Sequence, residues 1–342
     1  MVDTLCHSAA SDSIDDEDNF MPNLKAMATT LFLSGALVGA VSAQDFPSRP
    51  LRLLAPYGAG GSYDAMARVI GAKLGEQLGQ QVIVDNRPGA AGRIGMAIAV
   101  KMPPDGYNLL IVGNSQAVAP AVYTEVPYDL AKDIVPLAMI GIVTNVLVIH
   151  PSVNANSMQA LIALSKSKPG PLRFGSGGTG GIAHLSGELF KSMSGANLQH
   201  VPYKSAAQAT MANVGGEIEM NILNMTNAAA QVRAGRLRGL GVTSLKRSQF
   251  LAELPTLDES GLSGYEIVEF YALALPAGTP AGLVSRLHAQ VLKAVDATDV
   301  KEKYVQISAE PLTMTPERTR AFILDEQKKY AKIVKEVGIK PE

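Results

Sequence analysis

Hydrophobic and polar positions follow two alternating periods after residue 44. Short apolar runs bounded by turn residues predict strands at residues 51–55, 82–84, 109–112, 146–149, 172–174, 198–201 and 237–243. Longer stretches repeat apolar residues at helical spacing, as in residues 62–78, 94–100 and 182–193. Strands that alternate with helices predict a parallel or mixed sheet covered on both faces, so the expected fold class is α/β.

The end of the chain has a different pattern. Residues 280–295, 300–305 and 316–337 read as helices, and no strand-like segment follows them. Because an apolar helical stripe needs a partner surface, we expect these helices to pack back across the first half of the chain.

Two strand-rich halves of similar composition predict two domains with a binding cleft between them. The expected division places residues 44–144 with 275–342 in domain 1 and residues 145–274 in domain 2.

The first 43 residues have the features of an export signal. Lys25 precedes an apolar run over residues 31–41, and Val41-Ser42-Ala43 is a small-residue cleavage pattern. A membrane anchor is the alternative, but a span needs about 18 or more apolar residues. The acidic residues before Met21 do not suit an export signal, so Met21 or Met27 is a candidate start. We expect cleavage after Ala43 and release into the periplasm of a Gram-negative bacterium.

Composition and charge exclude several classes of function. Apolar residues make up 47% of the chain and charged residues 18%, which excludes a disordered chain. Cleavage would remove the only cysteine, Cys6, so disulfides and thiol chemistry are not expected. The first 43 residues hold one basic and six acidic residues, which leaves 29 basic and 25 acidic residues behind them. A net charge of +4 over that length predicts no nucleic-acid partner.

Two glycine-rich turns carry the candidate chemistry. Residues 56–64 lead from the first strand to the first long helix, and residues 172–181 lead from a later strand into another helix. Glycine allows close approach of the backbone, and a helix start presents unpaired N–H groups with partial positive charge. One such turn in each domain predicts an anion site in the cleft, whereas a capped tight turn is the plain alternative.

Catalytic and cofactor readings have less support. Gly175, Gly177 and Gly180 match the spacing of a dinucleotide fingerprint, but the acidic residue expected about twenty positions later is missing. No Gly-x-Ser-x-Gly elbow occurs in the sequence. His184 and Glu188 share a helix face, and a helix pair is favoured over a metal site because no third ligand is evident. We expect no catalytic residue, cofactor or metal.

Nine segments in order resemble the Bug-type solute receptors of tripartite tricarboxylate transporters. They are residues 47–50, 56–64, 86–95, 104–107, 175–185, 201–204, 233–235, 254–256 and 276–280. The resemblance implies a two-domain periplasmic binding protein of the type II-like class, each domain a mixed sheet flanked by helices. It further implies a hinge that closes on a small carboxylate, a monomeric receptor, and delivery to a membrane permease of one small and one large subunit.

The resemblance also assigns the candidate ligand-binding residues. They are Tyr57, Gly60, Gly61, Ser62, Tyr63 and Asp64 in the first turn, Asn114 and Ser115 after the third strand, and Ser176, Gly178, Thr179, Gly180, His184, Tyr203 and Asn224 in the second half. A receptor that signals to a membrane sensor, or an exported enzyme with His184 or Asp64 as base, are the alternatives.

Two departures from the family pattern bear on the ligand. Many relatives carry an aspartate within the segment that corresponds to residues 220–224, which here reads Met-Asn-Ile-Leu-Asn. Since an aspartate could pair with a ligand ammonium, its absence favours dicarboxylates or aromatic carboxylates over amino acids. Tyr63 is bulkier than the small residue common at its position, and its ring could stack on a ligand, narrow the pocket or lie on the surface.

Overall fold

The computed structural model describes residues 46–339. The predicted signal peptide and its cleavage after Ala43 lie outside these residues. Contacts group the chain from Pro47 onward into one unit, which contains all the strands and helices of the described residues.

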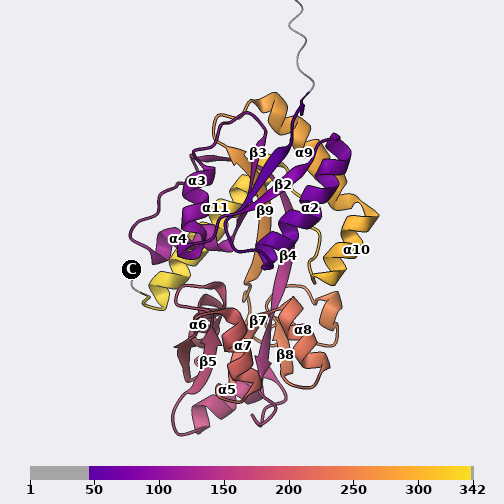
Figure 1. Ribbon diagram of the computed structural model, residues 1–342. Coiled ribbons are helices and arrows are strands. Elements are labelled where there is room, and N and C mark those ends of the chain that lie inside the picture. The colour runs from indigo at the N-terminus through magenta and orange to yellow at the C-terminus, as the bar shows by residue number, and fades with distance from the viewer. Residues whose placement is uncertain (1–45, 340–342) are drawn as a thin grey trace, which may run out of the picture. The chain divides into compact units, whose positions relative to one another are not determined.

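The first of two sheets contains five strands in the order β2-β1-β3-β9-β4 (Figure 1). Their bounds are β1 Leu51–Ala55, β2 Val82–Asn86, β3 Asn108–Gly113, β4 Ile134–Ile149 and β9 Val268–Pro276. The pairs β1–β2 and β1–β3 are parallel, whereas β9 runs antiparallel to β3 and β4. We call this sheet and the helices on it the first lobe.

Strand β4 continues into a second sheet. Its residues 134–144 pair with β9, and residues 145–149 pair with β7 and β8. The other strands of this sheet are β5 Leu172–Ser176, β6 Leu198–Pro202, β7 Met220–Asn224 and β8 Arg238–Val242. The pairs β5–β6 and β5–β7 are parallel. We call this sheet and its helices the second lobe.

Helices cover both sheets. Those of the first lobe are α2 Ser62–Leu78, α3 Arg93–Ala99, α4 Asn114–Val122, α9 Ala281–Asp296, α10 Thr298–Gln306 and α11 Pro316–Glu336, with a short 3₁₀ turn at Ala90–Gly92. Those of the second lobe are α5 Met158–Ser167, α6 Ile182–Ser194, α7 Ala206–Val214 and α8 Met225–Arg233, with a 3₁₀ turn at Gln249–Leu251. The mixed α/β fold confirms the expected class.

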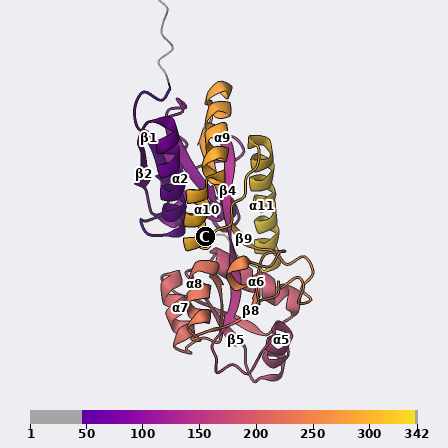
Figure 2. The same ribbon diagram turned by 90° about the vertical axis from the view of Figure 1, so that its right-hand side faces the viewer.

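Each lobe has its own apolar core. The first-lobe cluster gathers residues such as Leu54, Val112 and Phe270, and the second-lobe cluster includes Phe174 and Phe190. The helices at the end of the chain pack against the first lobe: α9 and α10 lie on α2, and α11 lies against α4 and β4 (Figure 2). This agrees with the expectation from their apolar stripes.

Three strands depart most from the sequence prediction. The pattern marks only residues 146–149 of β4, because Pro136 and Gly141 interrupt the apolar run that in fact forms one strand from Ile134. β7 and β9 are not predicted at all. The predicted domain border at residues 274/275 falls inside β9, which pairs with β3 and β4; the division of the chain into domains stays a prediction.

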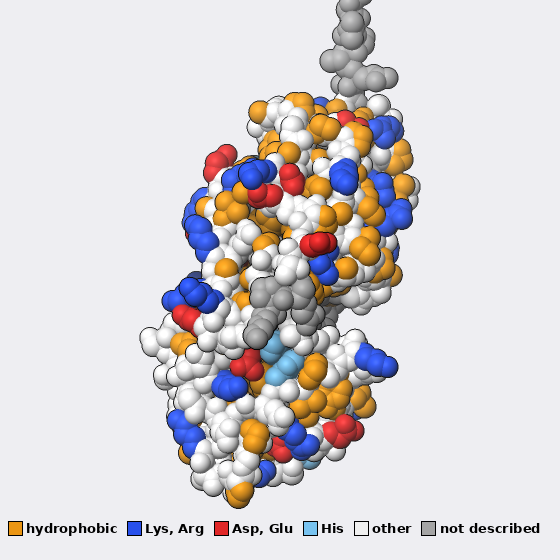
Figure 3. Space-filling model, turned by 90° about the vertical axis from the view of Figure 1, so that its left-hand side faces the viewer, with side chains coloured by type: hydrophobic (Ala, Val, Ile, Leu, Met, Phe, Trp, Pro, Cys, Tyr) orange, Lys and Arg blue, Asp and Glu red, His pale blue; other side chains and the backbone are white. Residues whose placement is uncertain are grey.

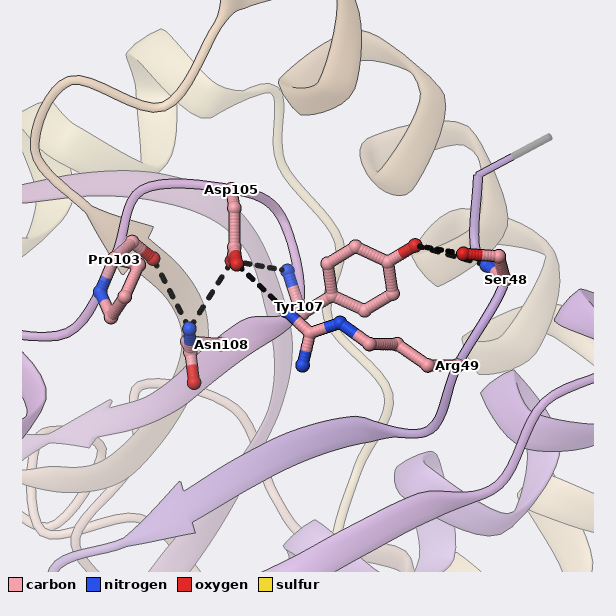
Figure 4. A network of polar contacts seen from close by, with 6 residues as sticks. All are labelled: Ser48, Arg49, Pro103, Asp105, Tyr107 and Asn108. Carbon is pink, nitrogen blue, oxygen red and sulfur yellow. Dashed lines mark hydrogen bonds and ion pairs between the residues drawn. The ribbon is translucent and has the colours of Figure 1, made fainter. Parts of the chain in front are cut away.

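Two of the family-like segments form a structural network at the start of β1 (Figure 4). The hydroxyl of Tyr107 accepts a hydrogen bond from the backbone N–H of Ser48 at 2.9 Å. Arg49 forms an ion pair with Asp105 at 2.9 Å and lies over the Tyr107 ring. Asp105 also accepts from the backbone N–H of Tyr107 and from Asn108. These contacts hold the start of β1 against the turn before β3, at the opposite end of β1 from the glycine-rich turn.

Candidate functional site

A cavity of about 330 Å³ is lined by residues of both lobes. Its walls come from the starts of helices α2, α4, α6, α7 and α8 and from strands β4, β7 and β9. The lining residues are Tyr57, Gly61, Ser62, Tyr63, Asn114, Ser115, Asn145, Ser176, Gly177, Gly181, Ile182, Ala183, Ala206, Ala209, Asn221, Ile222, Leu223, Asn224, Asn227, Glu269 and Tyr271. Helix starts carry free N–H groups and partial positive charge, so this cavity suits an anion.

The first glycine-rich turn joins β1 to α2. Gly60 has a φ of +82°, a left-handed conformation that glycine adopts without strain. The N-cap of α2 is Gly61, and no side chain caps its N–H groups. Asp64 does not contribute to the cavity: its carboxylate accepts from the Gly60 N–H and from Arg68, each at 2.9 Å. Although burial opposes ionisation, these bonds lower the pKa of Asp64.

Three tyrosines line the first-lobe side. The rings of Tyr57 and Tyr63 lie 4.7 Å apart, and Tyr271 meets Tyr63 edge-on at 5.2 Å. Burial raises the pKa of Tyr57 to about 12 and that of Tyr63 well above its usual value, so all these phenols stay protonated. Tyr63 is only 8% exposed, so the surface position considered for it is wrong.

The second glycine-rich turn joins β5 to α6. Gly177 must be glycine, because a β-carbon there would lie 2.6 Å from the backbone nitrogen of Ala206. Ser176 is buried, and its hydroxyl lies 2.8 Å from the Gly178 carbonyl and 2.7 Å from Nε2 of His200. The N-cap of α6, Gly181, leaves the helix start without a side-chain cap.

Two stacked histidines support this turn from behind. The rings of His184 and His200 lie 3.8 Å apart, and Nδ1 of His184 accepts from the Gly180 N–H at 3.0 Å. Burial lowers the pKa of each imidazole to about 4, so both are neutral at pH 7. His184 and Glu188 are 4.0 Å apart, consistent with the helix-pair interpretation. His184 thus orients the loop and does not line the cavity.

Asn114 is the first residue of α4, and its side-chain amide forms hydrogen bonds with other groups of the protein. Its Nδ2 donates to the Val268 carbonyl at 2.8 Å and to the Tyr330 hydroxyl at 2.5 Å, and its Oδ1 accepts from the Phe270 N–H at 2.7 Å. The side chain therefore joins α4 to β9 and α11. Ser115, the next residue, also lines the cavity.

Strand β7 and the start of α8 supply the amides of the second lobe. Asn224 caps α8 by accepting from the Asn227 N–H at 3.2 Å. Asn221 is only 1% exposed, and its Nδ2 has no hydrogen-bond partner. An unpaired buried donor costs free energy unless an acceptor reaches it, so Asn221 is poised to donate to a ligand oxygen.

Strand β9 brings the one acidic side chain of the lining. Glu269 and Tyr271 lie two residues apart, so both point to the same face of the strand. The Tyr271 hydroxyl donates to Oε2 of Glu269 at 2.7 Å. Burial raises the pKa of Glu269, and the bond from Tyr271 only partly offsets this.

The predicted residues divide into three groups in space. Those that line the cavity are Tyr57, Gly61, Ser62, Tyr63, Asn114, Ser115, Ser176 and Asn224. Gly178, Thr179 and Gly180 line an adjoining cavity of about 370 Å³, which shares Tyr57, Ser115, Gly177, Gly181 and Ile182 with the first. Gly60, Asp64, His184 and Tyr203 line neither; Tyr203 donates its backbone N–H to the Ser176 carbonyl.

Sequence reasoning missed Asn145, Asn221, Glu269 and Tyr271. A signal existed for the last two: they are polar or amphipathic residues at alternate positions of an otherwise apolar strand. Asn145 lies just before the predicted part of β4, and Asn221 lies in β7, which the pattern does not predict, so no local signal marked either residue.

No group of three His, Cys, Asp or Glu residues in the described part of the chain could hold a metal ion. In the same residues no helix is long and apolar enough to cross a membrane. Acidic and basic side chains are interspersed over the face shown in Figure 3.

Two α/β lobes with a shared cavity at their helix starts define the class of two-domain periplasmic binding proteins. The sequence places the chain more narrowly. Residues 66–339 match the model of the tripartite tricarboxylate transporter family receptor, and the chain belongs to that family. The resemblance to Bug-type receptors is thereby confirmed.

Individual relatives agree with this assignment. The protein BugT of Bordetella pertussis is 35% identical over 322 residues, which cover 94% of this chain and 99% of BugT. Among solved structures, Rpa4515 of R. palustris with adipate is 33% identical with a TM-score of 0.78, covering 87% of this chain and 100% of that one. The periplasmic binding protein BugD is 28% identical with a TM-score of 0.75 over the same shares.

Proposed function

We propose that this protein captures a small carboxylate in the periplasm and delivers it to a tripartite tricarboxylate-type permease of one small and one large membrane subunit. The observation that carries the proposal is the cavity itself: helix starts from both lobes line it, and none of its lining residues is Lys, Arg or His. A carboxylate would be held by backbone N–H groups, hydroxyls and amides, which stabilise an anion without a formal cation.

The two-lobed architecture supports a hinged receptor. β4 and β9 join the lobes, so a closing motion would turn on the backbone of these two strands. A ligand that contacts both lobes favours the closed state only by the difference between its affinities for the two states. We propose residues 144/145, where β4 passes from β9 to β7, as one border of the moving parts; the other predicted border, at residues 274/275, would cut through β9, which belongs to the first-lobe sheet. No catalytic role is proposed, because His184 and Asp64, the two candidate bases, lie outside the cavity lining.

The ligand class follows in part from β7. Asn221, Ile222, Leu223 and Asn224 line the cavity without a carboxylate, and on that ground alone dicarboxylates and aromatic carboxylates are favoured over amino acids. The tyrosines of the first lobe would suit an aromatic ring. Glu269, on β9, also lines the cavity and bears on the same choice.

Thermal unfolding against a panel of carboxylates tests the function. A ligand that binds only the native state adds about 2.7 kcal/mol to the free energy of unfolding at a hundredfold excess over Kd, and it thereby raises the melting temperature. The Ser62→Trp variant, which fills the cavity from α2, should lose the shift, whereas Ser167→Trp on the exposed end of α5 should keep it. If no carboxylate raises the melting temperature, or the compound that does is consumed, the receptor proposal is wrong.

Export, partner and assembly have separate tests. The intact mass of the protein from a periplasmic extract should equal that of a chain that begins at Gln44. Permease genes beside its own gene support delivery, whereas a sensor gene there supports a signalling receptor. Light scattering during gel filtration should give the mass of a monomer.

A further inference from the structure

Two polar groups of opposite kind face the cavity from different lobes. On the second-lobe side, Nδ2 of Asn221 is a buried donor without an acceptor. On the first-lobe side, Glu269 is the only acidic residue in the lining, and it has no ion-pair partner within the described residues. The lining thus contains an unpaired donor at one wall and a carboxyl group without an ion-pair partner at another.

The surroundings of Glu269 offer it hydroxyls but no cation. Tyr271 donates to its Oε2, and Tyr57 and Tyr63 lie near enough to interact with its charge. Lys, Arg and His are all missing from the lining, every residue of which the structure describes. No residue of the lining can therefore supply a positive charge to this carboxyl group, whereas a cationic ligand can.

Charge counting separates the candidate ligands. A dicarboxylate would add two negative charges to a cavity that already holds Glu269 and has no basic side chain. A carboxylate that also carries an ammonium group adds no net charge: its carboxylate meets Asn221 and the helix starts, and its ammonium meets Glu269. Like charges at short range inside a protein repel strongly, because the local dielectric is far below that of water.

We propose that Glu269 determines the specificity of this cavity by accepting a hydrogen bond from a cationic nitrogen of the ligand, so that aminocarboxylates are selected over dicarboxylates. The inference rests on the proposed carboxylate receptor function and refines it. The absence of an aspartate from β7 then no longer counts against amino acids, because Glu269 on β9 supplies the acidic group that β7 lacks.

The test uses ligands that differ only at one end. Hexanoate, 5-aminopentanoate and adipate each have a chain of six atoms counted from the first carboxylate carbon, and they end in a methyl, an ammonium and a second carboxylate group. The pair 3-phenylpropionate and phenylalanine differs by an ammonium beside the carboxylate. Dissociation constants are measured by titration calorimetry at pH 7.5 for the wild type, Glu269→Gln and Glu266→Gln.

Glu269→Gln removes the charge but keeps the shape and an acceptor for Tyr271, and its melting temperature checks that it folds. Glu266→Gln removes an equal charge three residues away, from a side chain outside the lining. The wild type and Glu266→Gln should bind at least one ammonium-bearing member about tenfold or more tightly than its partners, and Glu269→Gln should lose that preference.

A wild type that prefers adipate, or that prefers an aminocarboxylate equally in all three proteins, would overturn the role of Glu269 and leave the carboxylate receptor intact. Tighter adipate binding that Glu269→Gln abolishes would also overturn it, because Glu269 would then act as a protonated donor. Binding of no carboxylate to any of the three proteins would instead refute the receptor proposal on which the inference rests.

Discussion

Replacement of Asn114 by alanine should destabilise the whole first lobe. The amide joins three elements that are far apart in sequence: α4, which it opens; β9, through Val268 and Phe270; and α11, through Tyr330. Asn114 is only 3% exposed, so water cannot readily replace the lost partners. The sequence suggested a ligand contact here, whereas the observed hydrogen bonds assign the side chain a structural task.

The size of the effect follows from the three bonds. Each hydrogen bond contributes about 1 kcal/mol net, and each buried group left unpaired costs about 1–3 kcal/mol. For Asn114→Ala the expected loss in the free energy of unfolding is about 3–5 kcal/mol. With an unfolding entropy of about 2.1 cal/mol/K per residue, this corresponds to a melting temperature lower by about 5–8 °C.

Differential scanning calorimetry measures this change, and Asn154→Ala at an exposed position is the matched control. Tyr330→Phe removes only one of the partners, so Asn114→Ala and Tyr330→Phe should be less than additive in a double-mutant cycle. A loss below about 1 kcal/mol for Asn114→Ala, or full additivity of the pair, would refute the reasoning.

Two other predictions concern the second lobe. The pKa values of His184 and His200 are lowered to about 4, below the value of about 6.5 in an unfolded chain, so between these values the unfolded state binds more protons. The free energy of unfolding should therefore fall as the pH drops from 7 to 4, by about 3 kcal/mol for the buried His184 and by less for the part-exposed His200, and His200→Gln should flatten the profile obtained from urea titrations. A β-carbon at Gly187 would lie 2.2 Å from the Phe174 ring, so Gly187→Ala should lower the free energy of unfolding in urea by about 1–3 kcal/mol. Gly282→Ala, where no atom lies within 4 Å, should change it little; equal effects at both glycines would contradict the packing argument.

The cavity also explains how a receptor can bind an anion with few charged residues. Uncapped helix starts at Gly61 and Gly181 leave N–H groups available, and the same turns are kept in place by groups that do not line the cavity. Asp64 fixes the first turn through the Gly60 N–H, and His184 fixes the second through the Gly180 N–H. Such pre-organisation lowers the entropy that binding would otherwise cost.

The sequence by itself determined the local parts of this protein. The hydrophobic period and the turn residues that flank it predicted both α2 and β1 at their observed bounds. Amphipathic repeats and glycine-rich ends are properties of neighbouring residues, so the sequence alone shows them. The two glycine turns were recognised as candidate anion sites for the same reason, and eight of the predicted residues do line one cavity.

Only the tertiary structure decided what each polar side chain does. Asn114 and Asp64 looked like ligand contacts, but β9 and Tyr330 occupy the amide of Asn114, and Oδ2 of Asp64 is taken by Arg68 and by the N–H of Gly60. Asn221 and Glu269, 48 residues apart in the sequence, face one cavity because β4 carries β7 and β9 along two stretches of its length. Whether a polar group is free to meet a ligand depends on partners brought by distant strands, and no local pattern records them.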